Sequence, residues 1–347
     1  MKLGIGAVSF GPRASVNVEM IQHAEKLGFD SAWTAEAYGN DAVTTATWAL
    51  ANTTTLKVGT SIMQMPARQP AMAAMTAMTL DHLSGGRFIL GLGPSGPQVV
   101  EGWYGVPYGK PLTRTREYIK IIRSIWAREG ALEHQGEHYS IPLSGPSASG
   151  LGKPLKSILH GNPDIPIYTA SISPNGMRCA GEVADGVFPM MVDPEKVDSV
   201  YLPYIEEGFE AAGGDKSLDD FAIVPGVSVI ISDDIEKVRM PVKNNMALYI
   251  GGMGARNKNF YNDLAKRLGY EEAAVKIQDL FLGGQRAEAA LAVPDELVDA
   301  CHLVGPADRI RERLQAWKAA GAKKWVHTMN INTPQPEALE LIAEEML

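Results

Sequence analysis

The chain has 347 residues, of which 45% are hydrophobic, and its formal net charge is −8. That length and apolar content are enough for a full buried core, so they exclude an intrinsically disordered chain. The acidic balance, without a basic tract to neutralise phosphates, argues against nucleic-acid binding, and no apolar run reaches the length of a membrane span.

The two cysteines, Cys179 and Cys301, lie far apart and have no metal-ligand spacing, so we expect no metal site. A chain of this length without a disulfide framework is typical of the cytoplasm. The first six residues are too few and too glycine-rich for the apolar region of a signal peptide. We therefore expect a cytoplasmic protein that acts on a small molecule.

Predicted strands and helices alternate along the chain. The first helix, over residues 15–27, has Val18, Ile21 and Ala24 at helical spacing, and Gly28 follows as a C-terminal glycine. The expected strands cover residues 3–8, 31–35, 56–64, 88–92, 165–170, 186–191, 221–231 and 324–329. The further helices cover 42–52, 70–83, 113–127, 174–184, 194–212, much of 233–292, and 337–346. Eight strands with helices between them predict an α/β fold, a closed (β/α)8 TIM barrel that forms a single domain over residues 1–347.

Two segments interrupt this alternation. Residues 130–165 are rich in Gly, Pro and Ser, and we expect them to form an insertion over the mouth of the barrel. A second insertion is expected at about 250–292, within the long helical stretch. Neither carries a recognisable signature, although both are expected to shape the substrate pocket.

A glycine-rich loop, residues 91–97, follows the fourth strand. Without side-chain bulk its backbone can approach a ligand closely, and a strand ending in such a loop is typical of the carboxyl-terminal mouth of a barrel, where the active site lies. The loop lacks the Lys-Ser/Thr ending of a Walker A motif, and no helix is predicted directly after it, so the dinucleotide signal is weak. A simple tight connection is the alternative.

Polar or small residues follow other strands as well. Glu36, after the second strand, could accept a hydrogen bond from a ring N–H or position a substrate, with a helix cap as the alternative. Residues 59–64 place polar groups in an apolar strand, which indicates a bulge. Residues 168–176 favour a phosphate site at a helix N-terminus, or an ordinary cap made by Ser173 before Pro174. Met190 ends the sixth strand, where it could support a flat ring.

Residues 28–33, 83–88, 91–94 and 184–187, with a tail at 295–299 and 304–306, together resemble the luciferase-like superfamily of flavin and deazaflavin oxidoreductases. The similarity is greatest to reductases that depend on coenzyme F420, near methylenetetrahydromethanopterin reductase. The resemblance implies a bacterial-luciferase-like barrel that transfers a hydride between reduced F420 and a small organic substrate. An FMN-dependent monooxygenase and a non-catalytic flavin-binding barrel are the alternatives.

The resemblance also implies a set of site residues. Glu36 matches an acidic position and would take part in an ion pair or a proton relay. Ser61-Ile62 matches a bulge that carries a non-prolyl cis peptide in relatives and backs the ring. The residues expected to bind the cofactor are Tyr38, Asn40, Ser61, Ile62, Gln64, Gly93, Ser95, Gly96 and Met190, with Ala170, Ser171, Ile172 and Gly176 around its phosphate.

Two positions depart from the relatives. Ala37 stands where sugar-phosphate dehydrogenases of this superfamily carry a histidine, and Gly6 stands where the methanopterin reductases carry a glutamate. The substrates of those two groups therefore cannot be assigned to this chain. A homodimer is expected from the resemblance and from the apolar helices at 42–52 and 72–83.

Overall fold

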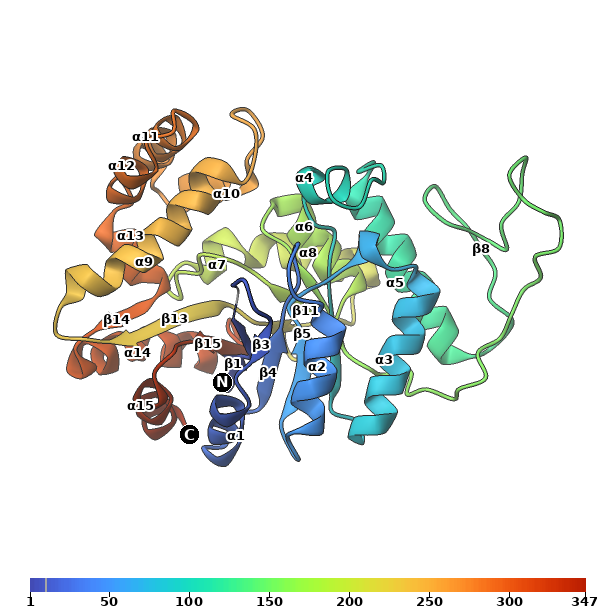
Figure 1. Ribbon diagram of the computed structural model, residues 1–347, viewed down its shortest axis with the longest axis horizontal. Coiled ribbons are helices and arrows are strands. Elements are labelled where there is room, and N and C mark those ends of the chain that lie inside the picture. The colour runs from blue at the N-terminus through green and yellow to red at the C-terminus, as the bar shows by residue number, and fades with distance from the viewer. Residues whose placement is uncertain (10) are drawn as a thin grey trace.

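The computed structural model describes residues 1–9 and 11–347 and is built around a curled sheet in which neighbouring strands run parallel (Figure 1). In order around the sheet the strands are β12 (Ala222–Ile223), β11 (Gly186–Phe188), β10 (Ile167–Ala170), β7 (Phe88–Gly93), β5 (Lys57–Thr60), β4 (Ser31–Thr34), β1 (Lys2–Gly6), β15 (Thr328–Asn332), β13 (Gly226–Ile231) and β14 (Leu303–Gly305).

The sheet closes between β12, at one end of this order, and β15. β12 pairs with β11, whereas β13, only a few residues later, pairs with β15. The amide of His327 donates to the carbonyl of Ile223 at 2.9 Å, and that of Asn330 donates to the carbonyl of Pro225 at 3.0 Å. These bonds close the sheet, which confirms the barrel. The predicted seventh strand is interrupted at Pro225, which has no N–H for a ladder.

Helices surround the barrel. They are α1 (Val18–Lys26), α2 (Ala42–Ala51), α3 (Pro70–Ser84), α4 (Pro97–Val100), α5 (Pro111–Ala127), α6 (Pro174–Val183), α7 (Val197–Val200), α8 (Leu202–Ala212), α9 (Ile235–Ala247), α10 (Phe260–Arg267), α11 (Glu271–Leu282), α12 (Arg286–Leu291), α13 (Asp295–Cys301), α14 (Ala307–Ala322) and α15 (Pro336–Met346). A 3₁₀ turn, η1 (Met65–Ala67), and a π turn, η2 (Leu248–Gly252), complete the helical elements. Short strands are β2 (Val8–Ser9) with β3 (Ser15–Val16), β8 (His134–Gln135) with β9 (Ser140–Ile141), and β6 (Met63–Gln64) beside β7.

Local chemistry explains where the predicted helices begin and end. α2 begins after Asp41, whose side chain accepts from the Thr44 amide, and α3 begins with Pro70 in its first turn. α3 ends at Gly85, which takes the left-handed conformation at φ 68°. By contrast, the helix expected over 15–27 begins only at Val18, because Ser15–Val16 pairs with Val8–Ser9 as a small hairpin.

The 130–165 segment does not lie over the mouth as expected. The Glu117 carboxylate on α5 accepts from the backbone amides of residues 137–139 at 2.8 to 3.1 Å, which holds the β8–β9 hairpin against the outside of that helix. Further along, a ring nitrogen of His82 on α3 lies 3.1 Å from the carbonyl oxygen of His160. Figure 1 shows the segment projecting beside α3 and α5.

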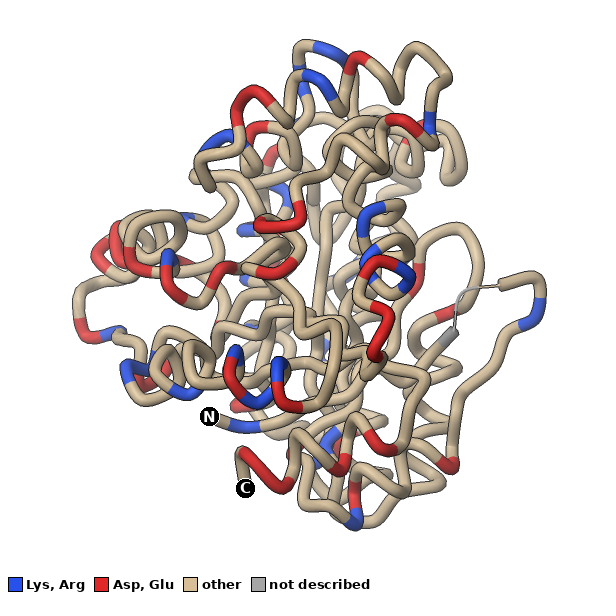
Figure 2. The backbone as a smooth tube through the Cα atoms, turned by 90° about the vertical axis from the view of Figure 1, so that its left-hand side faces the viewer, with Lys and Arg blue, Asp and Glu red and all other residues tan. Residues whose placement is uncertain are grey.

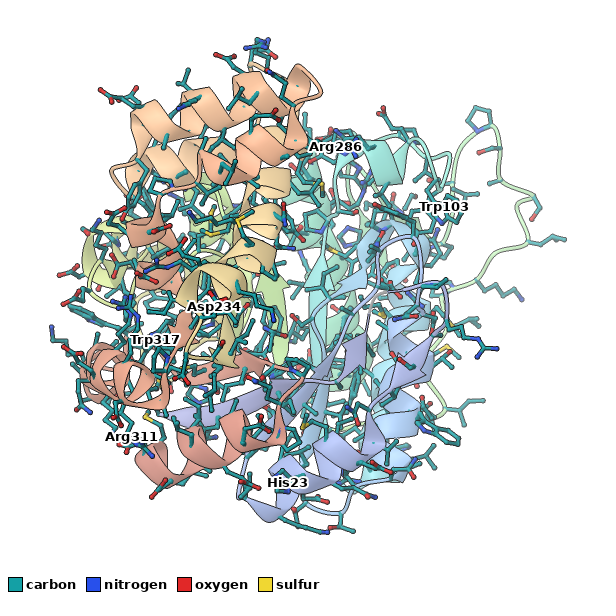
Figure 3. All side chains as sticks on the ribbon, turned by 60° about the vertical axis from the view of Figure 1, so that its left-hand side comes forward. His23, Trp103, Asp234, Arg286, Arg311 and Trp317 are labelled. Carbon is teal, nitrogen blue, oxygen red and sulfur yellow. The ribbon has the colours of Figure 1, made fainter. Side chains whose placement is uncertain are left out.

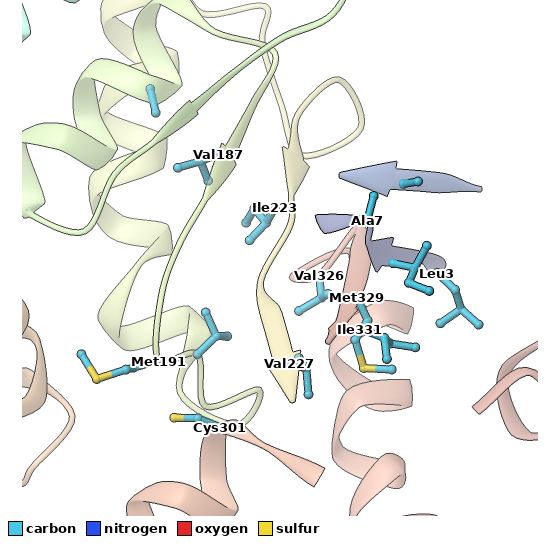
Figure 4. Close-up of a cluster of buried hydrophobic side chains, with 14 of the residues drawn as sticks. Leu3, Ala7, Val187, Met191, Ile223, Val227, Cys301, Val326, Met329 and Ile331 are labelled. Carbon is cyan, nitrogen blue, oxygen red and sulfur yellow. The ribbon is translucent and has the colours of Figure 1, made fainter. Parts of the chain in front are cut away.

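The core has two layers. Between the strands and the helices lies an apolar shell, part of which Figure 4 shows around Val187, Ile223 and Ile331. Inside the barrel, a separate cluster centres on Trp33, with Tyr168 and Phe188 at ring-centroid distances of 5.9 and 5.0 Å. Gly59 leaves the space that the Trp33 ring fills, since a Cβ there would lie 2.3 Å from the indole.

The surface is charged with both signs. Figure 2 shows basic and acidic residues interspersed along the backbone on the side it presents. Among residues 1–9 and 11–347, no helix is long and apolar enough to cross a membrane.

Candidate active site at the carboxyl ends of the strands

The predicted site residues lie on one arc of the barrel rim. They are carried by the carboxyl ends of β4, β5 with β6, β7, β10 and β11, which are consecutive in the sheet. Because parallel strands all end at the same rim, the topology brings these residues to one face. Figure 3 shows Trp103, which follows α4, in the upper half of the molecule, and His23 near its lower end.

The peptide bond between Ser61 and Ile62 is cis and not prolyl, as the resemblance implied. It separates β5 from β6, which sequence patterning had treated as one strand. The Glu36 amide donates to the Ile62 carbonyl at 3.3 Å. The Ile62 side chain is half-buried and, like Ala170, packs on the cluster around Trp33. Ile62 and Ala170 therefore form the apolar top of the barrel interior, here called the platform.

Glu36 is buried, with only 5% of its side chain exposed, and both carboxylate oxygens have partners. Oε1 accepts from the Gln64 amide at 2.6 Å and from Arg68 Nη1 at 2.7 Å, and Oε2 accepts from the Ala42 amide at 3.0 Å. The other side of the Arg68 guanidinium pairs with Asp41. Glu36 thus forms an ion pair with Arg68. Its carboxylate also links the start of α2, at Ala42, to the chain just after the cis peptide, at Gln64.

Electrostatic effects in this cluster favour the charged forms. Burial acts to lower the pKa of Arg68, but its hydrogen bond and charge interaction with Glu36 outweigh burial and raise that pKa. Burial likewise opposes ionisation of Asp41, yet hydrogen bonds from Thr44 and the charge of Arg68 lower the pKa of that carboxyl. Both shifts favour the charged forms of Arg68 and Asp41.

The loop after β4 and the side chain of Gln64 lie next to this cluster. Gln64 is buried, and its Nε2 donates to the Ala37 carbonyl at 2.8 Å. Its Oε1 is buried and accepts from no described residue. Tyr38 is 69% exposed, and Asn40 in the same loop is half-buried.

The glycine loop predicted at residues 91–97 begins later than expected, because β7 continues through Gly91 to Gly93. A Cβ at Gly93 would lie 2.7 Å from Cδ1 of Ile62, so the glycine is what admits that side chain to the platform. Ser95 takes the left-handed conformation at φ 59°, and Gly96 is the N-cap of the short helix α4, which begins at Pro97. The sequence analysis predicted no helix here, because a single four-residue turn has no periodicity to detect.

The loop after β10 leads into α6. Ser173 Oγ accepts from the Gly176 amide at 3.1 Å, so Ser173 caps α6 as the alternative interpretation of this segment expected. The Gly176 amide therefore already has a hydrogen-bond acceptor within the protein. No described residue accepts from the amides of Ile172 and Ser173. The half-buried Ser171 lies between β10 and this capped turn. A Cβ at Gly176 would meet Ser173 Oγ at 3.0 Å and Ser171 at 3.3 Å, so the turn is compact.

Met190 follows β11 and is held by a buried tyrosine. Tyr201 Oη donates to the carbonyl oxygens of Met190 and Met191, at 3.0 Å each. Met191 takes a left-handed conformation at φ 50°, and its side chain packs in the outer core. Only Met190 of this pair is half-exposed and able to meet a ligand.

Two cations of the site were not predicted. Arg68 lies before α3, and Arg267 on α10 donates from Nη2 to the Ile172 carbonyl at 2.7 Å. Neither arginine belongs to a recognisable sequence motif or to a periodic pattern of apolar residues, so the sequence alone gives no reason to select it. The proline at the start of α3 was the one local signal near Arg68, and it indicated only a helix start.

Comparison with known proteins identifies the family. The family model for luciferase-like monooxygenases matches residues 3–324. A Mycobacterium tuberculosis protein named as a coenzyme F420-dependent oxidoreductase is 44% identical over 330 residues, which cover 94% of this chain and 95% of that protein. The 5,10-methylenetetrahydromethanopterin reductase of Archaeoglobus fulgidus is 29% identical over 94% of this chain and 93% of its own length.

A solved structure shares the fold. The coenzyme F420-dependent tetrahydromethanopterin reductase of Methanopyrus kandleri superposes with a TM-score of 0.76 at 24% identity, covering 99% of this chain and 97% of that one. The match of the family model over most of the chain agrees with this superposition. The chain is a member of the luciferase-like monooxygenase family.

Proposed function

We propose that the protein is a coenzyme F420-dependent oxidoreductase that transfers a hydride between the reduced deazaflavin and a small organic substrate at the barrel mouth. The observation that carries this proposal is the 44% identity, along nearly the whole of both chains, with the mycobacterial protein that is named as a coenzyme F420-dependent oxidoreductase. When bound, the cofactor supplies the hydride chemistry, and the protein supplies binding and orientation.

The platform and its surroundings fit a flat, largely apolar ring. Ile62 and Ala170 offer an apolar surface, and Gly93 keeps side-chain bulk away from Ile62. The buried and unpartnered Oε1 of Gln64 could accept a hydrogen bond from a ring N–H. We assign Ser61, Ser95, Gly96 and Met190 to the walls of the same site, with Tyr38 and Asn40 at its outer edge.

The loop after β10 fits a phosphate. The unpaired amides of Ile172 and Ser173 lie at the N-terminal end of α6, where the helix dipole favours an anion. Arg267 places a positive charge beside the same loop. We assign Ser171, Ile172 and the compact turn at Gly176 to this phosphate site.

Glu36 acts in this proposal as a positioning residue. Its oxygens are occupied by two backbone amides and by Arg68, so they hold the loop after β4 and the chain around the platform in register. Of the two roles expected for Glu36, this arrangement supports the ion pair. It does not support a proton relay, because both carboxylate oxygens already accept hydrogen bonds within the protein.

The experiment that tests the function is a titration of the purified protein with oxidised F420 and, separately, with FMN. We expect saturable binding of F420 and oxidation of reduced F420 that depends on added substrate. Ser171→Asp should weaken F420 binding by at least about 100-fold, because placing like charges together costs several kcal/mol. Ser124→Asp on the outside of α5 adds the same charge and should leave affinity unchanged.

Tight binding of FMN with consumption of oxygen would contradict the proposal in favour of a monooxygenase. Binding of F420 without any substrate-dependent turnover would favour a non-catalytic barrel. Equal F420 affinity for both aspartate variants would remove the phosphate from the loop after β10.

We further propose that the protein is a homodimer that works in the cytoplasm, where buried thiols such as Cys179 and Cys301 stay reduced. Large apolar side chains are exposed on neighbouring helices: Trp48 on α2 is 59% exposed, and Met72 and Met75 on α3 are 54% and 52% exposed. Large exposed apolar side chains on neighbouring helices favour a protein interface there.

The dimer predicts a specific result in sedimentation. At micromolar concentration the wild-type protein should sediment as a dimer, and the double substitution Trp48→Glu, Met75→Glu should give a monomer, because it buries two charges in the proposed interface. Leu291→Glu on α12 changes an equally exposed apolar residue and should remain dimeric. A monomeric wild-type protein would contradict this interface.

A further inference from the structure

The inner face of the barrel differs between its two halves. On the half formed by β4, β10 and β11, the rings of the cluster around Trp33 fill the interior. On the half formed by β1, β15 and β13, the apolar shell outside the barrel takes Leu3, Met329, Ile331 and Val227 (Figure 4). Because side chains alternate along a strand, the residues between these face inward. The inward residues are small or polar: Gly4, Gly6, Gly226, Ser228, Asn330 and Asn332.

Contacts at the three glycines confirm this direction. A Cβ at Gly4 would lie 2.8 Å from Trp33 Nε1, an atom of the inner cluster. A Cβ at Gly6 would lie 2.4 Å from Asn332 Oδ1, and a Cβ at Gly226 would lie 3.4 Å from Asn332 Nδ2. The amide of Asn332 therefore lies on the inner face, between β1 and β13. Since Asn332 ends β15, this amide is at the mouth of the barrel.

The glycines leave a recess beside this amide. Apart from Asn332 Nδ2, no described atom beyond the neighbours in the chain lies within 4 Å of a Cβ at Gly226. Gly226 and Asn332 are exposed, Gly6 and Ser228 are half-buried, and Asn330 is only 8% exposed. The recess is thus open at Asn332 and narrows towards Asn330. It lies on β1, β15 and β13, whereas the platform lies at the ends of β5 and β10.

Asn330 brings an unpaired polar atom to the floor of this recess. Its Oδ1 is buried and has no hydrogen-bond partner among the residues that the structure describes. Two further buried atoms without such a partner, Ser31 Oγ and Trp33 Nε1, lie 2.9 and 2.8 Å from the position of a Cβ at Gly4. Gly4 pairs in register with Asn330, so the three atoms belong to one level of the barrel. Buried polar atoms nearly always have a partner, so this floor indicates a polar ligand.

We propose that the recess binds a hydroxyl or carboxamide group of the substrate, which donates a hydrogen bond to Asn330 Oδ1 and meets the amide of Asn332 at the rim. An amide side chain both donates and accepts, so it matches a group that does the same. An ester, an ether or a carboxylate has acceptors only and leaves Oδ1 buried without a partner, which is costly. The inference rests on the proposed function, which supplies the reaction at the platform, and it adds the residues that select the substrate.

A pair of probes that differ in one donor tests this contact. The protein saturated with oxidised F420 is titrated with cyclohexanecarboxamide and with methyl cyclohexanecarboxylate, which has the same ring and carbonyl but no N–H, and binding is followed by ligand-observed NMR. Asn330→Leu keeps a similar shape without the amide, so it should weaken the carboxamide about tenfold and leave the ester unchanged. Asn162→Leu removes an exposed amide from the 130–165 segment and should change neither probe.

Gly226→Val tests the position of the recess without removing a polar group. Gly226 is exposed and has no positive φ, so the variant should fold. The added side chain would enter the recess beside Asn332 and should weaken both probes at least about tenfold, equal to about 1.4 kcal/mol of binding free energy. If Asn330→Leu does not fold, the result for Gly226→Val decides the proposal.

The F420 affinity of each variant is measured first and should equal that of the wild type. Failure of the wild type to bind F420 would overturn the proposed function and this inference together. Normal F420 binding with equal carboxamide affinity in wild type and Asn330→Leu would overturn the inference alone. So would failure of the wild-type complex to bind the carboxamide, an equal loss for the ester, or unchanged binding of both probes by Gly226→Val. A loss of F420 affinity in either variant would assign the recess to the cofactor and overturn the inference as well.

Discussion

Gly91→Ala should destabilise the protein by at least about 3 kcal/mol, a large part of the stability of an ordinary domain. Gly91 is buried in β7, and a Cβ there would lie 1.6 Å from the carbonyl oxygen of Thr60. That oxygen belongs to the backbone of the neighbouring strand and cannot rotate away. Thr60 Oγ1 also donates to the Gly91 carbonyl at 2.7 Å and accepts from its amide at 3.0 Å. The strands would have to separate, and both hydrogen bonds would be lost.

The free energy of unfolding, obtained from denaturant titration, checks this prediction. Gly93→Ala is a matched control on the same strand, because its added methyl would meet the flexible end of Ile62 rather than backbone. The Gly93 variant should fold with a much smaller loss of stability. A Gly91 variant within about 1 kcal/mol of the wild type would show that β5 and β7 can move apart easily, contrary to the close packing expected of a buried sheet.

Glu36→Ala should reduce stability by about 3–5 kcal/mol, the usual cost of removing one partner of a buried ion pair. The substitution leaves the amides of Ala42 and Gln64 without their acceptor and removes the main partner of Arg68, whose side chain is only 18% exposed. Thermal or denaturant unfolding measures the loss, and F420 affinity should fall with it because the loop after β4 is no longer held.

Asp41→Ala is the matched control for this cluster. Asp41 also pairs with Arg68, but its side chain is 46% exposed, so water can replace it, and the loss should be about 1 kcal/mol, including its cap on α2. Equal losses in the two variants would show that the buried position of Glu36 gives it no special importance.

The barrel was predictable because its signals are local. Strands bounded by glycine and helices bounded by Pro70 or Gly85 can be identified along the chain, and parallel alternation then leaves few topologies. α14 also carries a usable signal, with Ile310, Leu314 and Trp317 buried at helical spacing, but the sequence analysis did not single it out. The last strand lies at Thr328–Asn332 rather than 324–329, since its boundary depends on pairing with β1 and β13.

The site was predictable to the level of strand ends and no further. Ser61 and Ser171 follow strands and Gly93 ends one, so the rule that parallel strands end together places them on one rim. Arg68 and Arg267 depend on long-range contacts that no periodicity encodes. The position of the 130–165 segment was misjudged for the same reason, because Glu117 on α5 binds it from a distance in sequence.

The proposed cofactor residues occupy one run of neighbouring strands, whereas the segment that includes α10 comes from elsewhere in the chain. At the end of α10 this segment contacts the rim through backbone carbonyls: Arg267 donates to the Ile172 carbonyl, and Lys196 donates to the Leu268 carbonyl. Contacts to backbone place little demand on the side chains beneath them. Specificity should therefore be transplantable: exchanging this segment between family members should alter the molecule that is turned over while the redox partner stays the same.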